Sequence, residues 1–295
     1  MSVSARHDVL AVIGGSGLYE MGWLEDVEEV SVSTPFGLPS DVVLRGQVKG
    51  GDATVLFLPR HGRGHRFSPS SINYRANICA LKMLGATHVL SVSAVGSLRE
   101  EIEPGDLVVV DQFIDFTKRR ISTFFDDGLV AHVPFADPVC PIMAAAVHDA
   151  ARATEARVHR GGTYVCIEGP QFSTRAESHM FRSFGAHVIG MTNLPEAKLA
   201  REAELPYATL ALTTDFDCWH VSEEAVSVEA VITVLNRNIV HARNVAKSLA
   251  HDLPDVSQSP ARHALQKSIM TSAGATSPDA QARLEWLIGP RQKAD

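Results

Sequence analysis

Residues Leu210 to His220 read Leu-Ala-Leu-Thr-Thr-Asp-Phe-Asp-Cys-Trp-His, an apolar run that ends in two carboxylates two residues apart. In an extended segment, residues i and i+2 point to the same side, so Asp215 and Asp217 are expected to face one ligand while the Phe216 ring points elsewhere. The carboxyl end of a buried strand is where α/β proteins bind ligands. The stretch therefore predicts substrate recognition and a proton source. A structural interpretation also fits, in which one Asp caps the next helix and the other lies in a turn.

The rest of the chain alternates apolar strands with amphipathic helices, which predicts an α/β fold with a largely parallel sheet and no second domain. The predicted strands span residues 9–13, 42–46, 54–59, 87–98, 105–110, 162–167, 187–193 and 205–213. The predicted helices span residues 71–84, 142–156, 194–202 and 222–249, and residues 113–140 form a long irregular excursion. Ser173 or Thr174 is expected to cap a further helix, with Glu177 near the capping-box position.

Groups suited to a ligand follow four of the strands. The loop Gly14–Gly17 offers backbone N–H groups and the Ser16 hydroxyl to an anion, although it is neither GxGxxG nor a Walker loop and also fits a plain tight turn. Residues 60–66 hold three Arg and two His, and Arg suits forked hydrogen bonds to phosphate. Ser93-Ala94 allows close approach to the backbone. With the carboxylate pair, these groups suit a substrate that is part phosphate and part basic heterocycle.

Composition narrows the class of protein. The chain has 295 residues, 45% of them hydrophobic and 21% charged, with a net charge of -7, which argues against nucleic acid as the main partner. No apolar run reaches the roughly 18 residues that a membrane span needs, and no signal-peptide core is present at the N-terminus. The four cysteines are scattered, as expected of reduced thiols in a cytoplasmic protein. The histidines form no HExxH or HxH pattern, so no metal site is predicted.

Five motifs, in this order, resemble the nucleoside phosphorylase family of the purine type, and within it the methylthioadenosine phosphorylase subfamily. The resemblance covers the chain to about residue 250, and the last two motifs are the most specific. The motifs are Gly14-Gly15-Ser16-Gly17-Leu18, Pro59-Arg60-His61-Gly62-Arg63, Glu168-Gly169-Pro170-Gln171-Phe172-Ser173-Thr174, Gly190-Met191-Thr192-Asn193-Leu194-Pro195-Glu196-Ala197 and Thr214-Asp215-Phe216-Asp217-Cys218-Trp219.

The resemblance implies a phosphorolysis in which orthophosphate attacks C1' of 5'-methylthioadenosine and releases adenine, leaving 5-methylthioribose 1-phosphate. It also implies a mixed sheet closed into a distorted barrel, a catalytic domain over residues 1–254, a homotrimer or a hexamer, and no metal or organic cofactor. Residues 255–295 match only loosely and are expected to form a partly helical tail that covers an active site. By the same analogy, phosphate is held by Ser16, Arg60, His61, Ser93, Ala94 and Thr192, and the nucleoside by Phe172, Met191, Asp215, Phe216 and Asp217. Specificity is assigned to Ser173, Val228, Val231 and Ile232, and His132 is expected to reach a neighbouring subunit's site.

The chemistry of the carboxylate pair agrees with the resemblance. A general acid near the purine N7 contributes roughly a hundred- to ten-thousand-fold, and Asp215 can fill that role if a dry pocket or the nearby Asp217 raises its pKa. A carboxylate accepts the adenine N6 amino group but repels the oxygen of a 6-oxopurine. The pair therefore predicts a preference for adenine, and Asp215→Asn is expected to shift that preference toward 6-oxopurines.

The 5' group and the reaction class leave alternatives open. The spacing of Val228, Val231 and Ile232 predicts a buried helix face, which fits either core packing or an apolar pocket for a methylthio group. A purine nucleoside or methylthioinosine phosphorylase is the nearest rival, and the two carboxylates argue against it. A D-x-D glycosyltransferase would use Asp215 and Asp217 to hold a metal ion. A non-enzymatic nucleotide-binding module is the third alternative.

Overall fold

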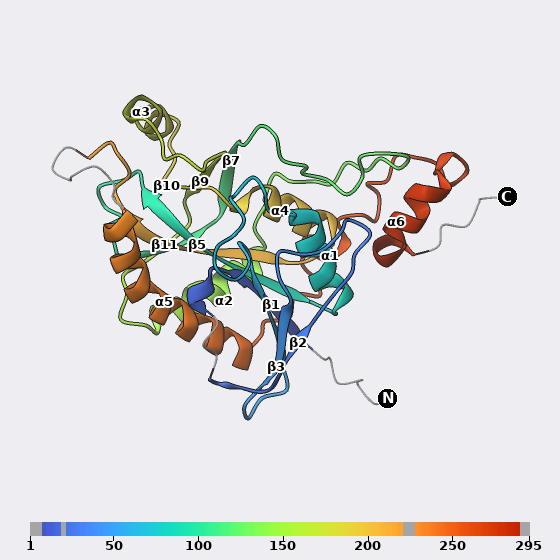
Figure 1. Cartoon of the computed structure of the whole chain (residues 1–295), viewed down its shortest axis with the longest axis horizontal. Helices are drawn as coiled ribbons and strands as arrows, with labels where there is room; N and C mark the ends of the chain where they lie inside the picture. The colour runs from blue at the N-terminus through green and yellow to red at the C-terminus, as the bar shows by residue number, and fades with distance from the viewer. Residues whose placement is uncertain (1–7, 19–21, 221–227, 290–295) are drawn as a thin grey trace.

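A long strand, β5 (His88–Ser97), lies at the centre of the molecule. The structure, a computed structural model, describes residues 8–18, 22–220 and 228–289. Within them β5 pairs along one edge first with β1 (Val9–Gly14) in parallel and then with β10 (Val188–Gly190) antiparallel. Its other edge pairs in parallel with β11 (Tyr207–Asp215). Strand β1 thus pairs with the first residues of β5 and β10 with its last two, while β11 runs along most of its length (Figure 1).

The sheet is mixed, and it closes on itself. From β5 it continues through β10 and β9 (Thr163–Ile167) to β7 (Gln112–Phe116), while β11 pairs antiparallel with β6 (Leu107–Val110). Since only Asp111 separates β6 from β7, the two branches form one continuous wall. The expected distorted barrel is confirmed, and the largely parallel sheet expected from alternation alone is wrong. One reason is that the short turn of residues 49–53 between β3 (Val43–Val48) and β4 (Thr54–Pro59) favours antiparallel pairing, and β2 (Leu24–Val30) also pairs antiparallel with β3.

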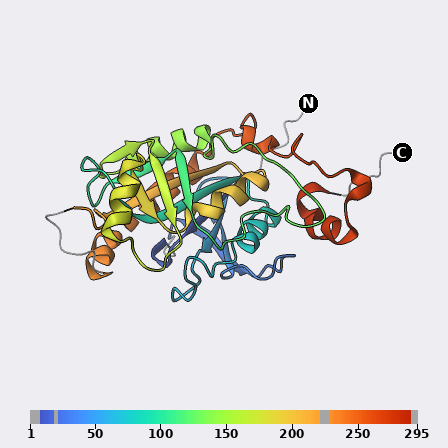
Figure 2. The ribbon, with the colours of Figure 1, turned by 90° about the horizontal axis from the view of Figure 1, so that it is seen from above.

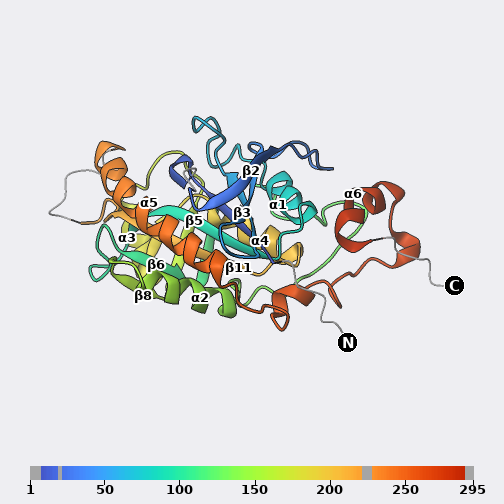
Figure 3. The ribbon, with the colours of Figure 1, turned by 90° about the horizontal axis from the view of Figure 1, so that it is seen from below.

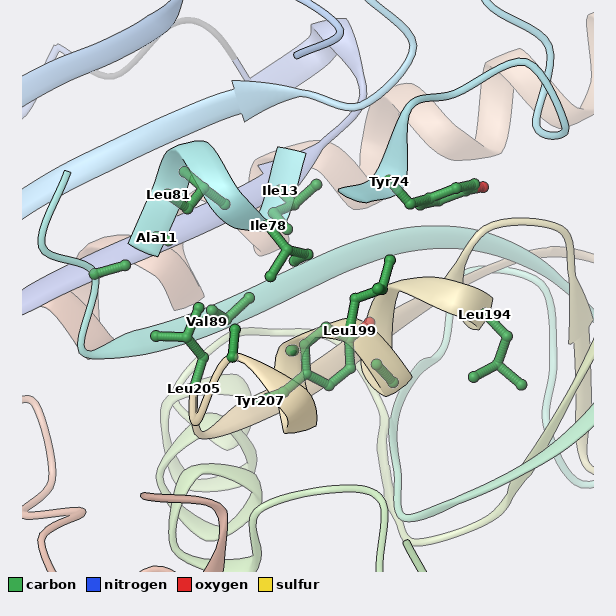
Figure 4. Packing of buried hydrophobic residues seen from close by; sticks show 14 of the residues in the cluster. Ala11, Ile13, Tyr74, Ile78, Leu81, Val89, Leu194, Leu199, Leu205 and Tyr207 are labelled. Atoms are coloured by element: carbon green, nitrogen blue, oxygen red, sulfur yellow. The ribbon is translucent and has the colours of Figure 1, made fainter. Parts of the chain in front are cut away.

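Helices cover both faces of the sheet, which explains why the central strands are buried along almost their whole length. Helices α5 (Val228–His251) and α2 (Pro141–Arg152) pack together against β11 on one face (Figure 3). Helices α1 (Tyr74–Met83) and α4 (Asn193–Glu202) cover the other face. Alternate strand residues enter the two cores: Val89 packs with Ile78 and Leu199 (Figure 4), whereas Leu90 faces the α2 and α5 side.

Most predicted elements are confirmed, with a few corrections. Strands β2, β7 and β8 (Val158–Arg160) were not predicted; β2 reads Leu-Glu-Asp-Val-Glu-Glu-Val and is largely exposed, and β8 has three residues. Thr174, rather than Ser173, caps α3 (Arg175–Ser183) and forms the capping box with Glu177. The predicted strand 187–193 is shorter, because Asn193 already begins α4.

The chain beyond residue 254 packs against the irregular segment that follows β7. It contains the short helices η2 (Pro260–His263) and η3 (Ala273–Ala275) and the helix α6 (Pro278–Ile288). The Met270 N–H donates to Val130 O at 2.8 Å, and the Trp286 ring contacts Phe124 with centroids 5.2 Å apart. Together they form an arm that projects from the barrel (Figure 2). The tail is partly helical, as expected; that it covers an active site stays a prediction.

Two kinds of feature are absent from the described part of the chain. There, no helix is long and apolar enough to cross a membrane, and no three His, Cys, Asp or Glu side chains gather as metal ligands. All four cysteines are free thiols.

Candidate active site

Three hydroxyl groups meet beside the middle of β5. The Ser93 Oγ lies 3.1 Å from Thr192 Oγ1 and 3.3 Å from the Tyr164 hydroxyl, and the Thr192 N–H points to the same hydroxyl at 3.4 Å. Burial raises the pKa of Tyr164 to about 12, so it stays a neutral donor. Next to them, Ala94 is the single exposed residue of β5, which marks where the strand opens to solvent. A cluster of hydroxyl donors at such an opening suits an oxyanion.

His61 follows β4 at the same end of the sheet. Its Nδ1 lies 2.8 Å from Phe67 O, which fixes the proton on Nδ1 because a carbonyl can only accept, and leaves Nε2 as an acceptor. The ring stacks on His65 with centroids 4.1 Å apart. Burial lowers the pKa of His61 to about 4, with Arg60, His65 and Arg120 adding to the effect. His61 is therefore neutral at pH 7 in the free protein.

Arg60 lies behind this opening with its guanidinium paired inside the protein. Its side chain is 2% exposed and forms a two-point ion pair with Glu196, at 2.8 Å from Nε and 3.1 Å from Nη2. Its Nη1 donates to Val92 O, and its Nη2 also donates to Ile13 O and to the Ser91 hydroxyl. Each of the three nitrogens thus has a protein acceptor. Glu196 lies in a motif quoted above, but the sequence did not assign it this role.

Asp215 and Asp217 lie at the end of β11 over Gly96. A Cβ built on Gly96 would come within 2.8 Å of Asp215 Oδ1 and 3.4 Å of Asp217 Cβ, so both carboxylates lean over the same point of β5. The Asp215 oxygens accept the Asp217 N–H at 2.8 Å and the Thr214 hydroxyl at 2.7 Å. The local turn of the structural interpretation therefore exists, and it orients Asp215.

The two carboxyl groups titrate abnormally. Burial raises the pKa of Asp215 against the opposing effect of its two hydrogen bonds. Burial, and then the charge of Asp215, raise the pKa of Asp217 to about 6, while the nearby Ser178 hydroxyl lowers it. Asp217 Oδ2 is buried without a hydrogen-bond partner in the described structure, and the backbone of Asp217 has a φ of 51°. The raised pKa values favour the protonated form of each carboxyl group.

The residues predicted to lie along the base differ in their surroundings. The Phe216 ring stacks on His220 with centroids 4.6 Å apart and contacts the ring of Trp219. The Phe172 side chain is 52% exposed, and the buried Ser173 Oγ has no hydrogen-bond partner within the described residues.

Other predicted residues lie outside the described set or away from these groups. The side chains of Ser16, Val228 and Val231 are outside the described part of the structure. Ile232, further along α5, is 48% exposed, which does not fit the simple core-packing alternative for this residue. His132 is exposed on the projecting arm, where its N–H donates to Ser268 O at 2.8 Å.

Sequence reasoning missed two residues of the site. Tyr164 stands inside an apolar strand, where nothing in the pattern distinguishes it from a core aromatic. Arg120 stands in the irregular segment after β7, yet its guanidinium reaches Met191 O at 2.6 Å and Glu168 O at 2.8 Å. No periodic signal marks that segment.

Comparison with known proteins agrees with this geometry. The profile of the Phosphorylase superfamily matches residues 9–251. The chain is 52% identical over 282 residues to the S-methyl-5'-thioadenosine phosphorylase of Geobacter sulfurreducens, covering 95% of this chain and 98% of that protein. It is 54% identical over 252 residues to the enzyme of the same name from Hyperthermus butylicus, covering 85% and 90%.

Solved structures give the same result. A methylthioadenosine phosphorylase from an Antarctic soil metagenomic library superposes with a TM-score of 0.89 at 51% identity, covering 96% of this chain and 99% of that one. The methylthioadenosine phosphorylase of Schistosoma mansoni in complex with adenine gives a TM-score of 0.80 at 38% identity, covering 85% and 94%. The chain therefore belongs to the phosphorylase superfamily, in its group of S-methyl-5'-thioadenosine phosphorylases.

Proposed function

We propose that the protein catalyses the phosphorolysis of 5'-methylthioadenosine to adenine and 5-methylthioribose 1-phosphate, with inorganic phosphate as co-substrate and no cofactor. The observation that carries the proposal is the arrangement along β5. Hydroxyl donors gather at Ser93 and Thr192, and the side chains of half-buried Asp215 and buried Asp217 lie over Gly96, three residues further along the strand. One strand thus presents an anion site beside a base site. The relatives that share this fold carry the same activity in their names.

Phosphate is assigned to the hydroxyl side of the site. The hydroxyls of Ser93 and Thr192 donate to its oxygens, together with the Ala94 N–H and the Gly14–Gly17 loop with Ser16. The free Nε2 of neutral His61 accepts a hydrogen bond from the P–OH group of HPO₄²⁻. We assign Arg60 to this site through its position directly before His61, while its guanidinium is paired with Glu196. The bound anion then stabilises positive charge that develops on the sugar.

The purine is assigned to the carboxylates. Breaking the N-glycosidic bond leaves negative charge on the base, which a proton at N7 neutralises. Asp215 donates or shares that proton, and the raised pKa values of both carboxyl groups keep a proton available in the pair. Asp217 orients Asp215 through its N–H and completes recognition of the adenine N6 amino group. Phe216 contacts the base through its backbone, because its ring packs against the rings of Trp219 and His220.

The sugar and its 5' group are assigned to residues of the segments around α3, α4 and α5. Met191 packs under the ribose, and Phe172 and Ser173 lie along the base. Val228, Val231 and Ile232 form the apolar end that takes the methylthio group. His132 reaches a neighbouring subunit's site, which the projecting position of its arm supports, and the assembly is a homotrimer or a hexamer. The free thiols fit a cytoplasmic location.

The test is adenine release from methylthioadenosine with and without phosphate. We expect release that depends on phosphate and persists with chelator, and higher kcat/KM for methylthioadenosine than for adenosine. Adenine release without phosphate, or loss of activity with chelator, would contradict the proposal; the second result would favour the D-x-D glycosyltransferase. Faster cleavage of methylthioinosine or inosine would favour the 6-oxopurine enzymes, and no cleavage at all would favour a binding module.

A further inference from the structure

Arg120 is a buried cation that the proposed mechanism does not use. It comes from the irregular segment between β7 and α2, and its side chain is 2% exposed. Its Nη1 donates to Met191 O at 2.6 Å and to Leu194 O at 2.7 Å. Its Nη2 donates to Glu168 O at 2.8 Å and to Ile167 O at 3.3 Å. One guanidinium therefore holds four backbone carbonyl groups.

These carbonyl groups belong to two separate segments of the candidate site. One segment links β10 to α4 and carries Met191 and Thr192. The other follows β9 and leads to Phe172 and Ser173. The two segments touch at Gly169, where a Cβ would come within 2.5 Å of the Met191 Sδ and where φ is 62°. Glycine thus allows the close approach of the two segments, and Arg120 ties their backbones together beside that contact.

The groups around Arg120 suit an arginine side chain better than a lysine side chain. In the described structure the carboxylate beside it is that of Glu168, 3.7 Å from Nε, 27% exposed and also bonded to Ser70 and the Lys118 N–H. Carbonyl dipoles therefore supply most of the compensation for the buried charge. A planar fork with donors on both arms reaches both segments at once, whereas a lysine ammonium is a point donor on a flexible stem.

We propose that Arg120 is a positioning residue of the active site. Its two arms fix the Met191–Leu194 segment against the Ile167–Ser173 segment, and so set the width of the cleft that takes the sugar and the base. The proposal rests on the proposed function, because it assigns the nucleoside to these two segments. A misplacement of about 1 Å in such a cleft costs on the order of a hundredfold in rate.

The experiment compares Arg120→Lys and Arg120→Met with Arg201→Met in the full chain. Arg201 is a matched control because it is also buried and donates to two loop carbonyls, those of Pro134 and Asp137, in another part of the molecule. Melting temperature, kcat and KM for methylthioadenosine at saturating phosphate are measured for each protein. If Arg120→Met fails to fold, Arg120→Lys carries the test.

We expect Arg120→Lys to raise the KM for methylthioadenosine at least about tenfold and to lower kcat, with a melting temperature no lower than that of Arg201→Met. Arg201→Met is expected to keep both constants within about twofold of the parent. Parent-like constants in Arg120→Lys, or an equal kinetic loss in Arg201→Met, would overturn the proposal. A parent protein that releases no adenine with phosphate would instead overturn the proposed function, and this proposal with it.

Discussion

The two carboxylates at the end of β11 have different hydrogen-bond partners. Asp215 accepts two hydrogen bonds, while Asp217 Oδ2 has no partner among the described residues. Hydrogen bonds to a carboxylate stabilise its ionised form, so the proton of the pair is held more firmly at Asp217. The pair still acts as a unit, because Asp217 supplies the N–H that orients Asp215. We infer that the pair keeps a proton available and that Asp215 passes it to the purine.

Because the pKa of Asp217 is raised, we expect the free energy of unfolding to depend on pH. The pKa of Asp217 is about 6 in the folded protein against an ordinary value of 3.8, so the folded state binds the proton more tightly. This contribution to stability is present below pH 3.8 and is lost as the pH rises through about 6. Between pH 4 and pH 7 the loss amounts to about 2 kcal/mol.

Asp217→Asn removes that titration and keeps a residue type that tolerates a positive φ. We expect the free energy of unfolding of Asp217→Asn, relative to the parent, to rise by about 2 kcal/mol from pH 4 to pH 7, measured by urea denaturation. Asp149→Asn, an exposed aspartate on α2, serves as the control and should show no such trend. A difference that stays constant with pH would contradict the account of Asp217.

Asp215 carries the prediction on base preference. Asn in its place presents an amide donor to the base, which suits the oxygen of a 6-oxopurine and lacks the proton for N7. Asp215→Asn is therefore expected to lower kcat/KM for methylthioadenosine by roughly a hundredfold or more, and to raise the relative rate on methylthioinosine. Steady-state rates on both nucleosides provide the measurement. An unchanged ratio of the two rates would show that Asp215 does not read the base.

Among the elements, β4 and α4 are joined by the buried pair Arg60–Glu196. Breaking a buried ion pair by removing one charge costs about 3–5 kcal/mol, because the other charge stays buried without compensation. We expect this loss for Glu196→Gln in chemical denaturation. The control is Glu28→Gln, whose ion-pair partner Arg45 is exposed, and it should cost at most about 1 kcal/mol. Equal effects of the two changes would mean that the buried pair has no special role in fixing α4 below the site.

The N-terminal cap of helix α3 is expected to contribute a smaller free energy. Its capping box at Thr174 directly follows Phe172 and Ser173, so the cap anchors the proposed base-binding segment. Thr174→Ala should destabilise the helix by about 1 kcal/mol and speed amide hydrogen exchange in α3 about fivefold. Ser183→Ala, at the other end of the helix, is the control and should change exchange by less than twofold, roughly the effect of an exposed substitution. Unchanged exchange in Thr174→Ala would show that the cap does not hold this element.

What the sequence could predict differs among the elements for physical reasons. Strands β1, β4 and β5 were predictable because burial on both faces makes them predominantly apolar. Strand β2 was not, because its side chains are mostly charged and exposed and only its backbone pairing makes it a strand.

Some residues of the candidate site could also be predicted from the sequence, and others could not. Residues directly after strands, such as Asp215, could be predicted from chain direction and residue type. Arg120 could not, since its partners lie 47 to 74 residues away in the sequence and are backbone carbonyls, which carry no side-chain signature. The pairing of Arg60 with Glu196 depends in the same way on how α4 packs against the sheet.

At the scale of the whole molecule, the projecting arm is tied to the core by α6. Leu284 is fully buried in the core, and the Trp286 ring packs against that of Phe36, with centroids 6.3 Å apart. Leu284→Ala should therefore lower the free energy of unfolding by about 2–5 kcal/mol in a single cooperative transition. Met270, 66% exposed on the same tail, is the control, and Met270→Ala should cost less than about 0.5 kcal/mol. A separate early transition for the arm would show that the tail folds independently of the barrel.

The most direct test of the central claim is the fate of the phosphorus atom. Phosphorolysis joins phosphate to C1' in the same reaction that releases adenine, whereas hydrolysis leaves phosphate unchanged. Phosphorus NMR of the protein with methylthioadenosine and phosphate follows both forms at once. We predict a sugar 1-phosphate signal that grows in step with free adenine, at one phosphate consumed per base. Adenine release with the phosphate signal unchanged would contradict the account.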